Sequence, residues 1–416
     1  MKSLPRKSSA GVLFGTYVVV EVVFVAVVVS GSTLMEVFEL SRTQLGLCLG
    51  AAQFGVLAAS LAVGPITHRR GPLWMVTTAL LGLLAALALV IAADRFAALF
   101  IGLVLAGVCA AAIHNGGMTL ISGIFASQVR RVMALASALW FGVGVATAPL
   151  IGAWLDLMAE HDARAWGFRL PLVVTLCLLG LCTVAVRWRL RWVRVLHLRE
   201  RRGRTTTATP TPWWRRMLPG GSWQWLWIPA MAVCHGMMLV GLLSWVSPMA
   251  QATFGVSEFK GGAMFAVTAL GLTAGRLVQV LYPLPIDDQR LLGISASLGA
   301  VALAAALLVP GYWPTFALLG LGMLLACCTG PCLFSLVAAR FAHIRSHVYG
   351  YLEAGVAAGA MLGALLVGLL ADQGWALATA MLVSPAAALT LALLSLAWRY
   401  TPEAVTGRQS VEPATP

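Results

Sequence analysis

Charged residues are scarce in this sequence. Lys, Arg, Asp and Glu make up 10% of its 416 residues, against roughly 25% in ordinary soluble domains, whereas hydrophobic residues make up 60%. A soluble enzyme or a soluble binding domain would carry much more charge, so the composition excludes both classes. Because a membrane-spanning helix needs about 20 apolar residues, a chain of this length has room for roughly twelve of them.

The sequence also lacks the motifs of several other protein classes. Its eight cysteines all fall inside apolar runs, so a disulfide framework is not expected. No G-x-x-x-x-G-K-[ST] loop is present, which argues against direct coupling to ATP. No H-E-x-x-H motif of the zinc-hydrolase type is present either. We therefore expect that the protein is not an enzyme and that it holds neither a resident metal ion nor a cofactor.

Long apolar runs, broken by Gly, Pro and clusters of charge, predict an all-α membrane protein with twelve transmembrane helices. Five valines surround Glu21 in Val18–Val23 and would favour a strand in water. A lone strand in lipid leaves its backbone groups without partners, so we predict a helix there. The spans are expected near residues 11–34, 42–66, 72–93, 96–125, 131–157, 167–189, 223–248, 260–282, 290–309, 312–339, 347–371 and 375–398.

Positive charge is distributed unevenly between alternate connections of these spans. One side would hold 22 of the 28 Lys and Arg residues, including ten arginines from Arg187 to Arg216, and the opposite side would hold five. Positive residues resist translocation, so we predict that both termini are cytoplasmic. This bias and contact with anionic lipid explain the net charge of +13 without a nucleic-acid partner.

The basic stretch between the sixth and seventh spans divides the chain into two related halves. We expect an N-terminal six-helix bundle at residues 1–190, a cytoplasmic basic linker at 191–222, a C-terminal six-helix bundle at 223–398 and a cytoplasmic tail at 399–416. Two related halves of six spans are typical of many secondary transporters.

The relation between the halves is visible as a weak internal repeat. One constant shift along the chain places Gly117, Ser122 and Gly142 on Gly330, Ser335 and Gly355. A slightly longer shift places Gly152 and Asp156 on Gly368 and Asp372.

Two local motifs are similar to those of a known family. Between the second and third spans, Gly64–Pro72 reads G-P-I-T-H-R-R-G-P and resembles the cytoplasmic loop G-x-x-x-D-R-x-G-R, with His68 at the aspartate position and Pro72 at the last basic position. In the fifth span, Gly144–Ala153 reads G-V-A-T-A-P-L-I-G-A and resembles G-x-x-x-G-P-x-x-G-G. Through these motifs the chain resembles the major facilitator superfamily from about residue 11 to residue 398.

The resemblance implies two pseudo-symmetric six-helix halves that rock about a central site to give alternating access. It implies that spans one, four, seven and ten line the central cavity. It also implies a gating role for Arg69, which matches the arginine of the loop motif. The fifth-span motif is often associated with antiporters; in physical terms it is a stripe of small residues beside the bend at Pro149.

Ionisable residues inside the spans are the strongest candidates for function, because charge is expensive at membrane depth. Glu21 lies near the centre of span one, where a carboxylate costs about 2.5–3.5 kcal/mol on insertion scales. Protonation would remove that cost, so we predict that Glu21 is the proton-coupling site, with Tyr17 one turn away on the same face. The alternative is a neutral glutamic acid that is hydrogen-bonded only for packing.

Most of the other polar candidates lie on spans that the resemblance places around the cavity, whereas Gln53 lies on span two and Trp140 on span five. His114 and Asn115 lie near mid-depth in span four, and His235 lies near mid-depth in span seven. Imidazole nitrogens suit both proton transfer and the binding of hydroxyl or carboxylate groups, and indole rings suit stacking on a sugar or an aromatic ring. The expected substrate-binding residues are Tyr17, Gln53, His114, Asn115, Trp140, His235 and Trp245.

A second chemistry is compatible with part of this set. Met231, His235 and Met238 share one helical face of span seven, and Cys328 and Cys332 share a face of span ten. Thioether, thiolate and imidazole groups together suit Cu(I), so import of a soft metal is an alternative function. Met and Cys are also ordinary apolar packing residues.

Two charged residues lie toward the cytoplasmic ends of their spans, Arg276 in span eight and Glu353 in span eleven. An isolated charge at this depth is less favourable than a paired one. We therefore predict that Arg276 and Glu353 pair, directly or through a neighbour, and help to close the inner gate. The alternative is that Arg276 alone extends to the membrane interface.

These observations predict a secondary active transporter that moves a small polar solute, with proton-coupled symport as the preferred mode. A proton-driven exporter of amphipathic compounds and a copper importer are the alternatives within this class, and a receptor that binds without flux is the competing class. We expect a monomer in the lipid bilayer of a bacterial inner membrane, with a small-molecule substrate and protons as its partners.

Overall fold

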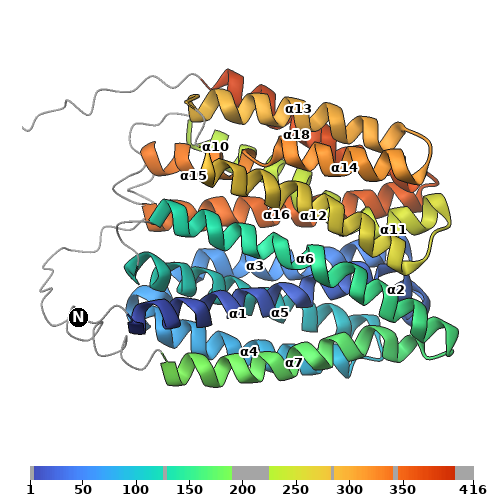
Figure 1. Cartoon of the computed structure of the whole chain (residues 1–416), viewed down its shortest axis with the longest axis horizontal. Coiled ribbons are helices and arrows are strands. Elements are labelled where there is room, and N and C mark those ends of the chain that lie inside the picture. The colour runs from blue at the N-terminus through green and yellow to red at the C-terminus, as the bar shows by residue number, and fades with distance from the viewer. Residues whose placement is uncertain (1–3, 125–128, 190–223, 283–284, 341–344, 399–416) are drawn as a thin grey trace, which may run out of the picture.

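The computed structural model describes residues 4–124, 129–189, 224–282, 285–340 and 345–398, and this part of the chain is a bundle of long helices without strands (Figure 1). The helices before residue 190 are α1 (Leu4–Val29), α2 (Gly31–Phe38), α3 (Arg42–Arg70), α4 (Pro72–Ile91), α5 (Phe96–Ile124), α6 (Val129–Glu160) and α7 (Arg164–Arg189). Those after residue 223 are α10 (Gln224–Gly236), the π-helical turn η1 (Met237–Gly241), α11 (Leu242–Phe254), α12 (Glu258–Leu281), α13 (Asp288–Leu308), α14 (Tyr312–Ala326), α15 (Thr329–Arg340), α16 (Arg345–Asp372), α17 (Leu377–Ala380) and α18 (Val383–Ala397). We call these two groups the first half and the second half.

The prediction of an all-α membrane protein with twelve spans is confirmed. Twelve segments of the described chain are long and apolar enough to cross a membrane, six before residue 190 and six after residue 223. Their large exposed side chains include many leucines and tryptophans, as expected for a bundle whose outer surface faces lipid rather than water.

Three spans depart from the expected single helices. The first span was expected to run from 11 to 34, but α1 ends at Val29 and the separate helix α2 begins at Gly31. The tenth span divides into α14 and α15 at Cys327 and Cys328, and the twelfth divides into α17 and α18. The break in the first span falls at Ser30 and Gly31 because serine competes with the helix for backbone hydrogen bonds and glycine has low helix propensity.

The seventh span is longer than expected. The sequence placed its end at residue 248, but α10, η1 and α11 follow one another without a break to Phe254. The π-helical turn η1 begins two residues after His235. Such turns are frequent at functional sites because they change the register of the side chains that follow.

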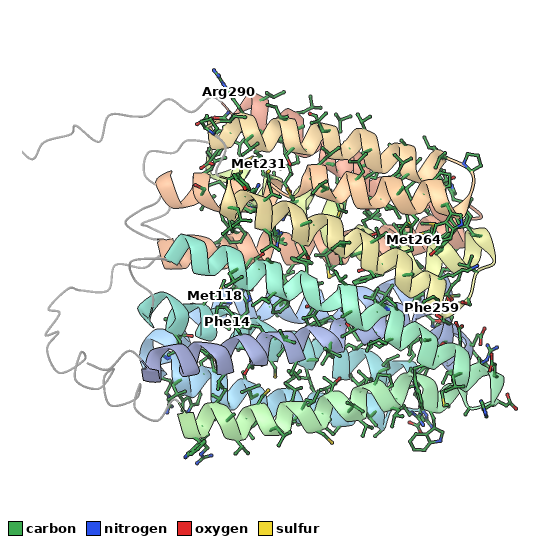
Figure 2. All side chains as sticks on the ribbon, viewed as in Figure 1. Phe14, Met118, Met231, Phe259, Met264 and Arg290 are labelled. Carbon is green, nitrogen blue, oxygen red and sulfur yellow. The ribbon has the colours of Figure 1, made fainter. Side chains whose placement is uncertain are left out.

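The ends of the bundle can be distinguished by the elements that lie there (Figure 1). We call the end with the start of α1 and the end of α7 the linker end, and the opposite end, with α2, the α2 end. Figure 2 shows Arg290, at the start of α13, at the linker end and Phe259, at the start of α12, toward the α2 end.

Two helix pairs hold the halves together along their length. α6 packs on α12, and α3 packs on α16. Glycines on these helices face backbone atoms of the partner helix: a Cβ at Gly262 of α12 would clash with the Ala148 carbonyl, and a Cβ at Gly46 of α3 would clash with the Ala364 carbonyl. Small residues therefore let the backbones approach closely, as expected for helices that associate in lipid.

At the α2 end, each pair is joined by an aspartate that caps the first turn of the partner helix. The Asp156 carboxylate accepts hydrogen bonds from the Glu258 and Phe259 N–H groups, at 2.9 and 3.0 Å. The Asp372 carboxylate accepts hydrogen bonds from the Arg42 and Thr43 N–H groups, at 3.1 and 2.8 Å. We call these two contacts the aspartate caps.

The aspartate caps are related by the internal repeat. The shift that places Asp156 on Asp372 also places Arg42, which Asp372 caps, on Glu258, which Asp156 caps. The same shift relates the close glycine contacts, because it places Gly46 on Gly262 and Ala148 on Ala364. The repeat seen in the sequence thus corresponds to two equivalent contacts between the halves.

Candidate functional site

A cluster of polar and aromatic side chains from α1, α5 and α6 lies in the interior of the first half. The Tyr17 hydroxyl donates a hydrogen bond to the His114 carbonyl at 3.1 Å. The Trp140 ring lies against both, with ring centroids 5.5 Å from His114 and 6.2 Å from Tyr17. Glu21, which is 8% exposed, has the Trp140 indole as a hydrogen-bond partner. We call Tyr17, Glu21, His114 and Trp140 the first-half cluster.

The second half contributes a carboxylate to this cluster. The Glu353 Oε1 atom of α16 lies 3.4 Å from His114 Nε2 of α5, and both side chains are about one quarter exposed. The contact is an ion pair when the imidazole is protonated and a hydrogen bond when it is neutral. His114 and Glu353 therefore link the two halves.

This contact differs from the predicted pair of Arg276 with Glu353. Arg276 of α12 instead donates a hydrogen bond from Nη1 to the Ser137 hydroxyl of α6, and its guanidinium lies over the Phe141 ring at 4.5 Å. The prediction was made from depth alone. Depth does not give the direction in which each helix presents its side chain, and α6 and α5 supply nearer partners.

The His114–Glu353 contact leads to a prediction for a double-mutant cycle. We expect His114→Gln and Glu353→Gln to be coupled by about 0.5–3 kcal/mol, because residues in direct contact share one interaction. The measurement is thermal unfolding of the purified protein in detergent. The matched control is a cycle between Arg276→Gln and Glu353→Gln, which should be additive within about 0.5 kcal/mol; coupling only in the control cycle would restore the pair expected from the sequence.

A second group of polar side chains surrounds His235 in the second half. His235 is 4% exposed, and its Nδ1 atom lies 3.2 Å from the Thr329 hydroxyl of α15. A Cβ at Gly330 would lie 3.1 Å from His235 Nε2 and 3.4 Å from Arg276 Nη2. We call His235, Arg276, Thr329 and Gly330 the second-half cluster.

The two clusters occupy comparable places in their halves. Gly117 of α5 faces the Tyr17 hydroxyl, just as Gly330 of α15 faces His235, and the repeat in the sequence aligns these two glycines. Figure 2 shows Met118, one turn after His114, and Met231, one turn before His235, both toward the linker end. In the first half, a polar group of span one thus lies against a glycine of span four. In the second half, a polar group of span seven lies against a glycine of span ten.

Within the described residues, two expected substrate-binding residues are not joined to these clusters by hydrogen bonds. The Asn115 side chain donates to the Ala111 carbonyl of its own helix at 3.0 Å. Gln53 is half-buried on α3, and no hydrogen bond connects it to either cluster in the described part of the chain. Adjacent residues on a helix point about 100° apart, which explains why His114 joins the cluster and Asn115 does not.

Trp245 is a packing residue rather than a residue that faces a solute. Its side chain is fully buried, and its indole N–H donates a hydrogen bond to the Ala364 carbonyl of α16 at 2.9 Å. The expectation that Trp245 stacks on a substrate is therefore corrected. A sequence cannot distinguish a tryptophan that packs between helices from one that lines a cavity.

The hydrogen bond of Trp245 leads to a prediction about stability. Trp245→Phe should lower the free energy of unfolding by about 1–3 kcal/mol, because the Ala364 carbonyl loses its donor in a buried place. Thermal unfolding in detergent measures the change. Trp313, which is 70% exposed, gives the matched control Trp313→Phe, for which we expect a change within about 0.5 kcal/mol. Equal effects of the two substitutions would contradict the packing role.

The side chains considered for a soft metal are all buried in the second half. Cys327 and Cys328 have their sulfur atoms 3.7 Å apart, and Met231 and Met238 are fully buried. Within the described residues, no three His, Cys, Asp or Glu side chains are placed to hold a metal ion. The copper alternative therefore lacks a ligand set built from these four residue types in that part of the chain.

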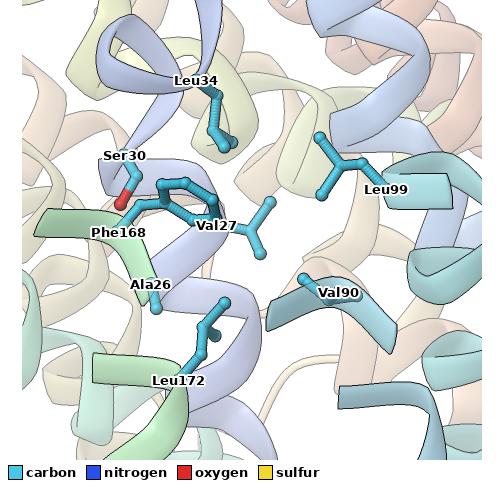
Figure 3. A pocket seen from close by; sticks show the side chains of 8 residues that line it. All are labelled: Ala26, Val27, Ser30, Leu34, Val90, Leu99, Phe168 and Leu172. Carbon is cyan, nitrogen blue, oxygen red and sulfur yellow. The ribbon is translucent and has the colours of Figure 1, made fainter. Parts of the chain in front are cut away.

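A small cavity in the first half is distinct from both clusters. Apolar side chains from five helices line it together with Ser30 (Figure 3). Ser30 lies nine residues beyond Glu21 in the chain, about 13 Å along the axis at 1.5 Å per residue. With an almost wholly apolar lining, this cavity is unsuited to a polar solute. Its lining residues are Ala26, Val27, Ser30, Leu34, Val90, Leu99, Phe168 and Leu172.

Comparison with known proteins decides the family. The sequence model of the Major Facilitator Superfamily matches residues 12–283, which is more than half of the chain. The chain belongs to the major facilitator superfamily. This membership agrees with the twelve spans and supports the interpretation of the protein as a membrane transporter. No curated protein matches the sequence.

Two solved structures of a bacterial homolog of the human lysosomal transporter Spinster show the same fold. The inward-facing, unoccupied form has a TM-score of 0.68 and the inward-facing, occupied form has a TM-score of 0.66. Each is 15% identical in sequence, and the alignment covers 95% of this chain and 96% of the homolog. At this identity the likeness concerns the superfamily fold over nearly the whole chain.

The residues that sequence analysis missed lie beside residues that it found. Ser137 and Phe141 flank Trp140 on α6, and Thr329 precedes Gly330 on α15. A serine, a phenylalanine or a threonine is ordinary in a membrane helix, so none of them carried a signal. Arg69, which the resemblance predicted to be a gate residue, falls in the last turn of α3, and its side chain lies outside the described part of the structure.

Proposed function

We propose that this protein is a proton-coupled secondary transporter of a small polar solute. Its two halves would alternate about the region between the first-half and second-half clusters, as expected for proteins built from two repeats. Glu21 would carry the coupling proton, and His114, His235 and Trp140 would contact the solute. The twelve spans and the superfamily membership support a transporter; the coupling ion and the solute class are part of the proposal.

One observation carries the proposal. In the first-half cluster, Glu21 and His114 both lie beside Trp140, and His114 contacts Glu353 of the second half inside the bundle, at the boundary between the halves. Carboxyl and imidazole groups can exchange protons, and ionisable residues at membrane depth are expensive unless they serve a function. A proton bound here would also alter the contact between the halves.

The linker end is proposed to face the cytoplasm of a bacterial cell. The excess of Lys and Arg in the connections at this end follows the rule that positive residues stay on the side of synthesis. Both aspartate caps would then lie on the outer side, and the divisions at residues 190, 222 and 398 would separate two bundles, a linker and a tail. The inner membrane is the corresponding location.

The runner-up function is proton-driven export of amphipathic compounds. The specific observation in its favour is the stripe of small residues around Pro149 in α6, where Gly152 contacts the Glu258 backbone and Ala148 contacts Gly262. This motif is the one often associated with antiporters. Substrate charge and the direction of the proton flux separate the two functions.

A ligand screen followed by a flux assay tests the proposal. The purified protein is heated in detergent with sugars, carboxylates, amino acids, lipophilic cations or Cu(I), and a ligand at a hundred times its dissociation constant should add about 2.7 kcal/mol of stability. The stabilising solute is then tested in proteoliposomes with and without a pH gradient. Accumulation that requires the gradient supports symport. Stabilisation only by lipophilic cations, with protons moving in the direction opposite to the compound, would favour the exporter.

A further inference from the structure

Arg276 is a buried cation to which the described residues offer no anionic partner. Its side chain is 6% exposed, and neither ion pair found among those residues includes it. The Ser137 hydroxyl and the Phe141 ring that contact it carry no net charge, and in this part of the chain its Nε–H is buried without a hydrogen-bond partner. A buried charge is expected to be paired, so this guanidinium points to an anion supplied from elsewhere.

The surroundings of Arg276 include the donors that an anion requires. The position that a Cβ of Gly330 would take lies 3.4 Å from Arg276 Nη2 and 3.1 Å from His235 Nε2. A guanidinium and an imidazole therefore converge beside Gly330, so close that a side chain at residue 330 would crowd both groups. The Thr329 hydroxyl lies at the other ring nitrogen of His235 and orients the ring.

The chemistry of these donors favours a carboxylate. A guanidinium presents two parallel N–H groups that match the two oxygens of a carboxylate, and an imidazole N–H adds a third donor. Among the described residues, the ionisable side chains that interact with Arg276 are His235 and Cys327, and neither is anionic in its ordinary form at neutral pH. The acidic groups lie at the first-half cluster, because Glu21 belongs to it and Glu353 contacts its His114. One cluster is therefore acidic and the other basic.

We propose that Arg276 and His235, which converge beside Gly330, bind the carboxylate group of the transported solute. This inference rests on the proposed function and specifies its substrate class as small organic acids. Arg276 then serves in recognition rather than as the gate residue expected from the sequence. One proton on Glu21 balances one carboxylate at Arg276, so transport of a monocarboxylate is electroneutral.

The experiment measures binding and flux separately. Thermal unfolding of the full-length protein in detergent is followed with sodium lactate, sodium succinate, inorganic phosphate, glycerol or lactamide at matched ionic strength. We expect a saturable rise in Tm with lactate or succinate and none with lactamide, which lacks the charge. A rise with phosphate alone, or with the neutral compounds alone, overturns the carboxylate assignment.

Two variants locate the binding in the second-half cluster. Arg276→Gln should weaken lactate or succinate binding by roughly 10- to 100-fold, as expected for loss of hydrogen bonds to a charged group. Gly330→Ala keeps every charge but places a methyl group 3.1 Å from His235 Nε2 and 3.4 Å from Arg276 Nη2. Because this group displaces both donors, the variant should weaken binding to a similar extent. Arg290→Gln, at an exposed position, and Gly180→Ala, where a Cβ meets no atom within 4 Å, are the controls. Unchanged affinity in both cluster variants overturns the proposal.

The flux assay distinguishes failure of this inference from failure of the proposed function. Proteoliposomes are loaded to impose a pH gradient or a potassium diffusion potential, and uptake of labelled lactate or succinate is measured. Lactate uptake that is driven by the pH gradient and does not respond to the potential supports both the carboxylate site and the proposed function. Arg276-dependent binding without uptake keeps the carboxylate site but overturns transport. Gradient-driven uptake of a sugar that does not depend on Arg276 keeps transport but overturns the carboxylate site.

Discussion

Glu21→Gln is expected to abolish accumulation of the solute driven by a pH gradient while leaving exchange of the solute intact. A proton gradient of two pH units supports at most about 100-fold accumulation for one proton per solute, since each unit is equivalent to about 1.36 kcal/mol. Glutamine keeps the shape and hydrogen-bonding capacity of a protonated glutamic acid near Trp140 but releases no proton. Accumulation in proteoliposomes should therefore fall to simple equilibration, about 1-fold.

Counterflow supplies the control within the same variant. Exchange of labelled for unlabelled solute requires the halves to alternate but needs no net proton movement, so Glu21→Gln should retain it. Glu36→Gln is the matched substitution: Glu36 is about half exposed in an ion pair with Arg164, and surface pairs contribute little, so we expect wild-type accumulation. If Glu21→Gln still concentrates the solute with the same dependence on pH, the coupling assignment is wrong.

Removal of both aspartate caps is expected to loosen the contact between the halves at the α2 end. In Asp156→Asn, one carboxylate that accepts two backbone N–H groups becomes an amide with a single acceptor oxygen and no charge opposite the helix N-terminus. Loss of a cap costs about 0.5–2 kcal/mol. The double variant with Asp372→Asn should show the sum, about 1–4 kcal/mol, because the two caps share no residue.

Hydrogen exchange measures this loosening at the capped residues. The amides at the start of α12 should exchange faster in Asp156→Asn, and those at the start of α3 should exchange faster in Asp372→Asn. A cap energy of about 0.5–2 kcal/mol corresponds to roughly 2- to 30-fold faster exchange. If the halves separate as rigid bodies, each single variant also accelerates exchange at the other cap. Asp94→Asn, at an exposed position of the chain, is the control; acceleration there to the same extent would show that the effect is nonspecific.

The contacts of Asp156 and Asp372 show how much structural information a repeat in the sequence contains. The constant shift between the two halves was visible without coordinates, and it identified residues that make equivalent contacts. It did not say what those contacts were. Each aspartate bonds to a helix of the other half, and only the packing of α6 on α12 and of α3 on α16 brings these segments together.

For the charged residues of the interior, too, the sequence identified the residues and only the structure identified their partners. Sequence alone selected Glu21, His114, His235, Arg276 and Glu353, because an ionisable side chain in an apolar run is costly wherever the helix lies. It could not select their partners. Glu353 meets His114 and not Arg276, since rotation of each helix about its axis depends on packing against several neighbours and not on residue depth.

What the sequence determined by itself is the class of protein: twelve spans, two related halves and, through two motifs, the superfamily. Hydrophobicity and charge are summed over about 20 residues for each span, so these conclusions tolerate local error. The tertiary structure decided the role of single side chains. It buried Trp245 between helices, turned Asn115 onto its own helix and placed Arg276 beside Gly330 with no anion from the described residues, because a side chain's partner depends on helix contacts that residues far apart in the chain determine together.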